Sequence, residues 1–249
     1  MFGLQKGRYR ARLARTDADL RAAQRLRYIA FAGDAAREAP DALDVDSFDG
    51  RCSHVLVEEV ATGRPVCCFR ILPLAHGGEI TQSYSAQYYE LSPLAEFEGP
   101  IMEMGRFCIH PEAKDPDILR VAWAALTRYV DDEGVNLLFG CASFKGTDAG
   151  AYLDAFAMLK ERHLGPKRWL PRVKAPNVFR FAARLRRKPD RRAAMLRMPP
   201  LLKSYLLMGG WVSDHAVVDD HMNTLHVFTG VEVGAIPAAR KRLLRAAAQ

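Results

Sequence analysis

Hydrophobic and polar residues alternate in some segments of the chain and follow a helical period in others. Residues 9–14 alternate as an edge strand does, and Thr16 then precedes a segment whose apolar residues recur at helical spacing. Thr16 has the side chain of a typical N-cap, so we expect a helix from there to about residue 32. Residues 54–73 contain two strand patterns around Thr62 and Gly63, which predicts a hairpin.

The middle of the chain shows a strand, a helix and a second strand. Residues 79–100 are polar and aromatic, and we expect a surface excursion with a short helix there. Residues 101–109 then form a strand pattern that Pro111 ends. The segment 115–134 has the pattern of a helix closed by Gly134, and residues 135–144 form an apolar run typical of a buried strand.

The C-terminal part predicts a helix over residues 148–163, a basic region, further strands between residues 209 and 233 and a short basic helix at the end. Arg180, Arg184, Arg187 and Arg191 follow one another at three or four residues, which predicts a basic helical stripe with a kink at Pro189. Repeats and low-complexity linkers are absent from the sequence. We therefore expect one compact α/β domain with a C-terminal elaboration.

Charged residues also occur where the pattern predicts burial. The segment LDVDSFDG contains Asp44, Asp46 and Asp49, while Glu103 and Arg106 interrupt an apolar strand pattern and Arg70 lies in another. Burying a charge without a partner costs several kcal/mol, about 3–5 when a pair is broken. The sequence therefore predicts that these side chains pair with one another in a polar site.

The composition excludes several classes of protein. With 249 residues, 49% of them hydrophobic, the chain can bury a substantial core. Its longest apolar run, residues 201–212, is shorter than a membrane-spanning helix needs, and the first residues lack the apolar stretch of a signal peptide. We expect a cytoplasmic protein.

Cysteine and histidine spacing does not predict a metal site. The five cysteines have apolar neighbours and no Cys-x-x-Cys pair, and the seven histidines are scattered. We interpret the cysteines as reduced thiols.

The positive charge lies in the C-terminal third. Residues 160–249 contain 19 Lys and Arg against six Asp and Glu, a net charge of +13, while the preceding part carries −6. The interleaved Arg and apolar residues after position 178 suit an anionic membrane surface or an acidic protein partner, whereas no nucleic-acid recognition motif accompanies them.

The order of these motifs resembles that of the acyl-homoserine-lactone synthases and the related N-acyltransferases of ornithine-lipid synthesis. The matching parts are RLRYIAF, the acidic segment 44–49, Phe69-Arg70 and Glu103-x-x-Arg106-Phe107, and they span most of residues 10–165. The segment from Pro199 to Phe228 is similar to the ornithine-lipid branch. Asp44 stands where the lactone synthases usually have Glu, His221 and Met222 stand where a less polar or aromatic pair is expected, and Gly105 widens the space beside Arg106.

This resemblance implies a GNAT-like fold, with a central mixed sheet flanked by helices, and an acyl-carrier-protein-dependent N-acyltransferase. Residues 1–172 would form the core, and residues 173–249 would form a basic extension completing the same domain. The reaction would move a (3-hydroxy)acyl group from carrier-bound phosphopantetheine to the α-amino group of ornithine, without a further cofactor. The lyso-ornithine lipid would pass to a downstream O-acyltransferase, and the enzyme would lie peripherally on the inner face of the membrane.

The chemistry of amide formation suggests a role for each candidate residue. Attack on a thioester needs a neutral amine, so a base must remove its proton. We expect Glu103 as the base, with Asp46 as a second catalytic carboxylate that orients the ammonium group. Substrate binding is assigned to Asp44, Asp49, Arg70 and Arg106. The backbone N–H groups of Phe107, Cys108 and Ile109 are expected to contact the acyl-pantetheine. The carrier-protein or membrane surface is assigned to Arg180, Arg184, Arg187 and Arg191. Asp49 could instead brace the loop through Arg70, and Arg106 could pair with Glu103 for stability alone.

Other interpretations remain open at this point. The turn HPEAKDPDIL has no glycine and three acids, which makes it a poor cradle for the pyrophosphate of free coenzyme A and favours a carrier protein. His110 with Asp115, and His215 with Asp220, fit the His-x-x-x-x-Asp dyad of glycerolipid O-acyltransferases. The remaining alternatives are a lactone synthase, acylation of another amino acid such as glutamine, and a basic binding module without activity.

Overall fold

The computed structural model describes residues 3–33, 35–39 and 41–248, which fold into two compact units. Unit 1 comprises residues 1–73, 104–134 and 238–249, and unit 2 comprises residues 74–103 and 135–237. Both are therefore assembled from separate stretches of the chain. The expected division after residue 172 falls within unit 2, inside the short strand β8 (Arg172–Val173), and stays a prediction.

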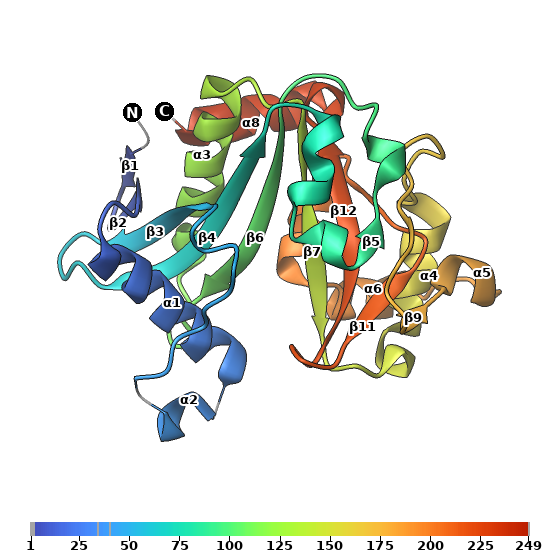
Figure 1. Ribbon diagram of the computed structural model, residues 1–249, viewed down its shortest axis with the longest axis horizontal. Helices are drawn as coiled ribbons and strands as arrows, with labels where there is room; N and C mark the ends of the chain where they lie inside the picture. Colours follow the sequence, from blue (N-terminus) through green and yellow to red (C-terminus); the bar gives the residue numbers. More distant parts are fainter. Residues whose placement is uncertain (1–2, 34, 40, 249) are drawn as a thin grey trace. The chain divides into compact units, whose positions relative to one another are not determined.

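Unit 1 is a sheet covered by helices. Its strands follow the order β1-β2-β3-β4-β6, with bounds Gly3–Lys6, Tyr9–Leu13, Ser53–Glu59, Pro65–Leu74 and Ile101–Ile109. The last residue of β4 and the first three of β6 belong to unit 2. Its helices are α1 (Asp17–Ala32), α2 (Ala35–Glu38), α3 (Pro116–Asp132) and α8 (Ala238–Ala248). Helix α1 lies on one face of the strands, and α3 with α8 on the other (Figure 1). The predicted edge strand β2 pairs on both sides, because residues 3–6 form an unpredicted strand beside it.

The local signals for α1 are confirmed. Thr16 and Asp19 form a capping box, in which the Thr16 hydroxyl accepts from the Asp19 N–H at 3.1 Å and the Asp19 carboxylate accepts from the Thr16 N–H at 3.2 Å. Ala23 and Leu26 then pack against Leu56 of β3. This packing fixes the rotation of α1 and therefore the direction in which its polar residues point.

Unit 2 contains the remaining strands. The order β6-β7-β12-β11-β9 uses β7 (Leu137–Lys145), β12 (Thr224–Glu232), β11 (Ala216–Asp219) and β9 (Val178–Phe179), and β10 (Trp211–Val212) also pairs with β12. Strands β6 and β7 are parallel from Ile101↔Leu137 to Glu103↔Phe139, while β12 pairs antiparallel with β7, β11 and β10, and β11 pairs antiparallel with β9. The predicted mixed sheet flanked by helices is thus confirmed.

Helices α4 to α7 build the main core of unit 2. They span Leu153–Arg162, Phe181–Arg184, Arg191–Arg197 and Pro200–Leu207, and a 3-10 turn η4 (Ala149–Tyr152) precedes α4. Their apolar residues pack against those of β7 and β12, with Phe156 and Phe181 stacked at 5.1 Å. A last 3-10 turn, η5, covers Val233–Ala235.

Residues 79–100, within the segment 75–100, are not the predicted surface excursion. The segment contains the 3-10 helices η1 (Gly77–Gln82), η2 (Ser85–Gln87) and η3 (Ser92–Leu94) and the strand β5 (Tyr89–Glu90), which pairs with β8. Ile80, Tyr89 and Leu94 are at most 1% exposed. Tyr89 packs edge-on against Phe228 of β12, with ring centroids 5.7 Å apart. Tyr89 and Phe97 of this segment are therefore core residues, while Tyr84 and Tyr88 are partly buried.

The predicted basic helical stripe is wrong as a helix. Arg180 precedes α5, Arg184 ends it, Arg187 lies in the following loop and Arg191 begins α6. The break has a local cause, because Pro189 disfavours helical backbone at the residue before it and Asp190 serves as the N-cap of a new helix. All four arginines are exposed. None of the helices within the described ranges is both long and apolar enough to cross a membrane.

Candidate active site

Six charged side chains of unit 1 form one ion-pair network. Asp44, Asp46 and Asp49 come from the loop before β3, and their cationic partners come from three regular elements: Arg27 of α1, Arg70 of β4 and Arg106 of β6. The three carboxylates balance the three guanidinium groups. This network, called the acid–arginine cluster below, confirms that the acids of residues 44–49 pair with Arg70 and Arg106, whereas the pairing of Glu103 with them stays a prediction.

Asp49 lies at the buried centre of the acid–arginine cluster. Its carboxylate accepts hydrogen bonds from Arg27 at 2.7 and 2.8 Å, from Arg70 at 3.1 Å and from the Gln24 amide at 2.9 Å. The ring Nε2 of buried His54 lies 3.0 Å from the Asp49 carbonyl oxygen. Asp49 therefore joins the acidic loop to α1 and β4, which is the bracing role considered from the sequence.

Asp46 bridges two strands. Both of its carboxylate oxygens accept from the Arg70 guanidinium, at 2.6 and 2.8 Å, and one also accepts from Arg106 at 3.1 Å. The Phe48 N–H donates to the same carboxylate at 2.9 Å. A bidentate pair of this kind fixes both position and orientation, because two parallel N–H···O bonds allow only one arrangement of the two planar groups.

Asp44 completes the cluster and forms part of its accessible edge. Its carboxylate pairs with the Nε atoms of Arg27 at 2.8 Å and Arg106 at 3.2 Å. The side chains of Asp44, Asp46 and Arg106 keep 18, 20 and 13% exposure, whereas those of Arg27, Arg70 and Asp49 keep at most 5%. A ligand can therefore reach two carboxylates and one guanidinium of this cluster.

The pairing controls the protonation of the acids. Burial alone would raise the pKa of Asp49, but hydrogen bonds from Arg27 and Gln24 outweigh it and hold that pKa well below its usual range. Burial also raises the pKa of Asp46, but the hydrogen bonds and the charge of Arg70 outweigh this effect, so that the pKa of Asp46 is lowered. Both groups are carboxylates at neutral pH, and the lowered pKa makes Asp46 a weak base.

Arg106 has an unusual backbone for a strand residue. Its φ angle is 51°, in the left-handed region that costs a residue with a Cβ about 1–2 kcal/mol. The conformation places its guanidinium against Asp44 and Asp46, 6.0 Å from the ring centroid of Phe31. Gly105 beside it faces the Arg70 side chain, where an added Cβ would lie 3.5 Å from Nε. Strain of this kind is typical of functional positions.

The proposed backbone donors follow Arg106 on β6. Phe107 stacks on Phe69 of β4 with centroids 5.6 Å apart, and Cys108 is buried with its Sγ 3.5 Å from that of Cys68. Ile109 ends the strand, and the next residue, His110, donates its N–H to Val66 at 2.8 Å. The assignment of these N–H groups to the acyl donor stays a prediction.

Sequence reasoning missed Arg27 and Gln24. Arg27 is 1% exposed, and it lies four residues after Ala23 on the buried side of α1. The signal was present in the sequence, because a charged residue at helical spacing within an apolar face needs a buried partner. Which partner it finds depends on the loop that begins at residue 43.

Glu103 is fixed by the segment 84–85 of unit 2. It is 4% exposed, and its carboxylate accepts from the N–H groups of Tyr84 and Ser85 at 2.7 and 2.8 Å and from the Ser85 hydroxyl at 2.6 Å. The Ser85 hydroxyl also lies 3.4 Å from the Sγ of Cys141 on β7. The carboxylate is therefore held in one orientation by short charge-assisted bonds.

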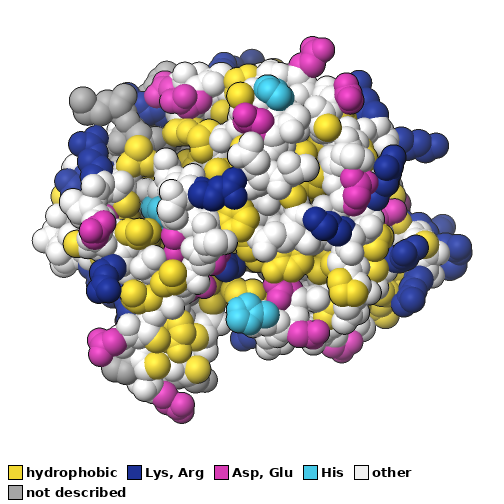
Figure 2. Space-filling view, viewed as in Figure 1, with side chains coloured by type: hydrophobic (Ala, Val, Ile, Leu, Met, Phe, Trp, Pro, Cys, Tyr) yellow, Lys and Arg dark blue, Asp and Glu magenta, His cyan; other side chains and the backbone are white. Residues whose placement is uncertain are grey.

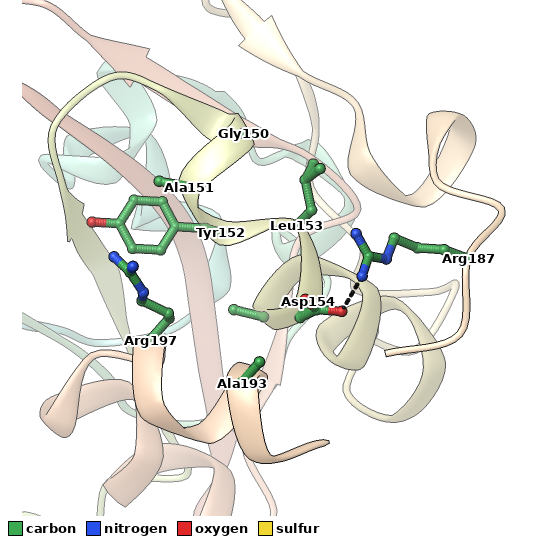
Figure 3. A pocket seen from close by; sticks show the side chains of 9 residues that line it. Gly150, Ala151, Tyr152, Leu153, Asp154, Arg187, Ala193 and Arg197 are labelled. Atoms are coloured by element: carbon green, nitrogen blue, oxygen red, sulfur yellow. Dashed lines mark hydrogen bonds and ion pairs between the residues drawn. The ribbon is translucent and has the colours of Figure 1, made fainter. Parts of the chain in front are cut away.

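Unit 2 also contains a cavity of about 250 Å³ beside α4 and α6. Tyr152, Asp154, Arg187 and Arg197 line it, and in Figure 3 Asp154 points to Arg187 while Arg197 lies beside the ring of Tyr152. None of the predicted catalytic or substrate-binding residues lines this cavity. The cavity is instead part of the basic region, and Arg187 is the predicted surface residue that it contains.

The residues of the two His-x-x-x-x-Asp patterns make other contacts in the part of the chain that the structure describes. Asp115 caps α3 and accepts from Arg8 and, at 3.1 Å, from Tyr9, while His110 accepts from the Glu112 N–H at 3.3 Å. His215 lies 2.6 Å from Asp214, its neighbour in sequence. Among the described residues, no three His, Cys, Asp or Glu side chains are placed so that they could hold a metal ion together.

Comparison with known proteins identifies the family. A model described as an acetyltransferase (GNAT) domain matches residues 26–124. An L-ornithine N(alpha)-acyltransferase of Rhodobacter capsulatus is 35% identical over 238 residues, which cover 92% of this chain and 91% of that protein. A protein of the same name from Rhizobium meliloti is 30% identical, with 90 and 80% covered.

Solved structures are more distant. The N-acyl amino acid synthase FeeM from uncultured soil microbes has a TM-score of 0.48 at 11% identity, with 97% of each chain covered. The acyl-homoserine-lactone synthase LasI has a TM-score of 0.43 at 16% identity, with 90% of each covered. The length and identity of the match to the curated relatives decide the assignment, and the chain belongs to the L-ornithine N(alpha)-acyltransferase family of GNAT-type N-acyltransferases.

Proposed function

We propose that this enzyme transfers a (3-hydroxy)acyl group from acyl-carrier protein to the α-amino group of ornithine and releases a lyso-ornithine lipid. One observation carries the proposal: Asp44 and Asp46 lie beside Arg106 at the accessible edge of the acid–arginine cluster. The chain has this arrangement as a member of the L-ornithine N(alpha)-acyltransferase family. An α-amino acid has the complementary charges on adjacent atoms. Its ammonium group can approach the carboxylates while its carboxylate approaches the guanidinium.

The buried part of the cluster supports this binding mode. Arg27, Arg70 and Asp49 are enclosed by partners, so their role is to hold the loop that presents Asp44 and Asp46. Substrate contact by Arg70 and Asp49 remains a prediction. Preorganised charges stabilise a bound zwitterion without the cost of ordering long side chains at the moment of binding.

Amide formation needs one proton acceptor. A base removes a proton from the ammonium group, the nitrogen attacks the thioester carbonyl, and the tetrahedral intermediate expels the phosphopantetheine thiolate, which takes up a proton. Glu103 is the proposed base, because its hydrogen bonds to Tyr84 and Ser85 fix its position and Asp46 has a lowered pKa. Asp46 then orients the ammonium group, and N–H groups of Phe107, Cys108 and Ile109 are the proposed donors to the oxyanion.

The donor is proposed to be a carrier protein and not free coenzyme A. The N-terminus of α3 carries Asp115, which accepts from the Asp117 N–H at 2.9 Å, and Asp117 adds a second negative charge in the first turn. A pyrophosphate would be repelled there. A carrier protein presents the same pantetheine arm without that diphosphate, and the net charge of +7 favours encounter with an acidic carrier.

The single-chain product favours an enzyme on the inner face of the membrane, where a downstream O-acyltransferase can take up the lyso-lipid. This location, like the donor, belongs to the proposal.

The test is a direct assay of purified enzyme with 3-hydroxyacyl-carrier protein or the same acyl group on coenzyme A. Mass spectrometry should detect acyl-ornithine, with much less product from glutamine or from the coenzyme A donor. Because screening acts over a Debye length of about 10 Å at 0.1 M salt, the carrier-protein rate should fall at higher salt. Equal rates with both donors would reject the carrier assignment, and a preference for glutamine would reject ornithine.

Two variants separate the catalytic roles. Glu103→Gln should lower kcat by about 100-fold or more with little change in the KM for ornithine, because it removes the base and keeps the shape. Asp46→Asn should mainly raise that KM. Glu96→Gln, at an exposed acid, is the matched control. An unchanged kcat in Glu103→Gln would exclude Glu103 as the base, and a pure kcat effect of Asp46→Asn would exchange the two roles.

A further inference from the structure

Helix α6 exposes an apolar residue at the centre of its outer face. Ala194 and Met198 are 0 and 1% exposed and belong to the core of unit 2. With 100° between successive helical residues, Leu196 and Arg192 then point away from that core. Leu196 is 79% exposed and its neighbour Met195 44%. Arg192, Met195 and Leu196 are called the α6 face below.

The orientation of this helix is fixed from both sides. Asp190 caps it by accepting from the N–H groups of Arg192 and Ala193 at 2.8 and 3.0 Å. Asp154 of α4 in turn accepts from the Asp190 N–H at 3.0 Å and from Arg187 at 2.8 Å, the pair drawn in Figure 3. Together with the buried Ala194 and Met198, these contacts hold Leu196 outward. Its exposure is therefore a property of the folded unit.

Positive charge surrounds the α6 face along the chain. Residues 180–203 contain nine Lys and Arg and a single acid, Asp190, which gives a net charge of +8. Figure 2 shows Lys and Arg side chains gathered at the edge of the molecule where Figure 1 draws α5. Exposed apolar side chains in a basic segment are suited to the surface of an anionic bilayer, which has negative head groups and an apolar interior.

We propose that the α6 face docks on an anionic phospholipid bilayer, with Leu196 and Met195 entering the acyl boundary and Arg192 contacting lipid phosphates. This docking rests on the proposed function, because it would let the one-chain lipid product pass directly into that bilayer.

Lipid fits this face better than a carrier protein does. A stable protein interface buries about 800 Å² on each partner and needs a complementary surface for its apolar centre. The α6 face has two apolar side chains on a seven-residue helix. A bilayer takes up isolated apolar side chains without a matching cavity, and long arginine side chains can reach the phosphates while their stems stay in the apolar zone.

The test uses the full chain and vesicles of phosphatidylglycerol and phosphatidylcholine, with pure phosphatidylcholine for comparison. The wild type should co-sediment with the anionic vesicles at low salt and dissociate at high salt. Leu196→Gln should weaken this partition about tenfold, because a leucine no longer leaves water. Arg192→Gln should weaken it about fivefold, since each basic residue near such a surface contributes a similar increment. Val60→Gln, at an exposed apolar residue of the β3–β4 turn, should bind as the wild type does.

Acyl transfer from soluble carrier protein to ornithine is measured in the same variants. Weaker vesicle binding with normal acylation supports the proposal. Wild-type vesicle binding by Leu196→Gln overturns it, as does equal binding to the neutral vesicles. Normal vesicle binding by Leu196→Gln with a raised KM for the carrier protein also overturns it and assigns the face to the carrier. If Leu196→Gln binds vesicles more weakly but the wild type does not acylate ornithine, the proposed function is rejected and the docking surface is retained.

Discussion

Asp49 shows how a single buried side chain can hold a whole site. Its carboxylate contacts Arg27, Arg70 and Gln24, which come from α1 and β4 and have almost no exposed surface. Two of these partners carry a charge that water cannot reach. Removal of the carboxylate charge would leave both guanidinium groups without their central partner while the Asp46 and Asp44 pairs remained.

Asp49→Asn should therefore lower the free energy of unfolding by about 3–5 kcal/mol, the usual cost of breaking a buried ion pair. Urea unfolding followed by circular dichroism measures this change. Asp41→Asn, at an exposed acid of the same loop region, should change stability by less than about 0.5 kcal/mol. A loss below about 1 kcal/mol in Asp49→Asn would show that Asp46 and Asp44 can take over the buried charges.

At the scale of elements, the segment 75–100 depends on close approach between its own turns. The Gly77 N–H donates to the Phe97 carbonyl at 2.9 Å, and a Cβ on Gly77 would lie 2.0 Å from the Leu94 carbonyl oxygen. That contact is with backbone, which cannot move aside as a flexible side chain can. Glycine at position 77 thus lets η1 pack against η3 and keeps Tyr84 and Ser85, the partners of Glu103, in a folded segment.

Gly77→Ala should destabilise the protein by about 3 kcal/mol or more, at the upper end of the usual cost of overpacking. Gly234→Ala is the control, since nothing lies within 4 Å of its added Cβ, and it should leave stability unchanged or raise it by up to about 1 kcal/mol. Thermal unfolding of the two variants tests the difference. Equal melting temperatures would mean that residues 75–100 can shift without loss.

At the scale of the whole molecule, buried histidines make stability depend on pH. Burial lowers the pKa of His226 on β12 to about 4, and it also lowers the pKa values of His54 and His163. A histidine with a lowered pKa in the folded state binds more protons when unfolded. The contribution of these histidines to the free energy of unfolding is therefore fully present above about pH 6.5, the ordinary pKa of histidine, and is lost as the pH falls toward 4.

Between pH 7.5 and pH 5, His226 alone should remove about 2 kcal/mol from the free energy of unfolding. Urea unfolding of the wild type and His226→Gln at both pH values measures this contribution, because the other histidines and the acids are common to both proteins. The variant should lose about 2 kcal/mol less than the wild type over this range. Parallel losses would mean that His226 is already accessible to protons in the folded protein.

Local patterns in the sequence determined most of the regular elements. The Thr16 cap, the spacing in α1 and the hairpin around Gly63 depend on residues close in the chain, so they could be predicted without tertiary contacts. The cost of burying unpaired charge likewise predicted that the acids of residues 44–49 would pair with Arg70 and Arg106. The family resemblance added the fold class, which the match of residues 26–124 to a GNAT domain supports.

Only the tertiary structure decided which distant groups become partners. Arg27 meets Asp49 through the rotation of α1 against β3, and Glu103 accepts from Tyr84 and Ser85 because a segment without clear periodicity folds into unit 2. The charge sequence from Arg180 to Arg191 predicted one helix, but the proline and the capping aspartate divide it. The periodicity of hydrophobic residues in the sequence indicates only whether a residue is buried. The identity of its partner depends on how elements far apart in the chain come together in the fold.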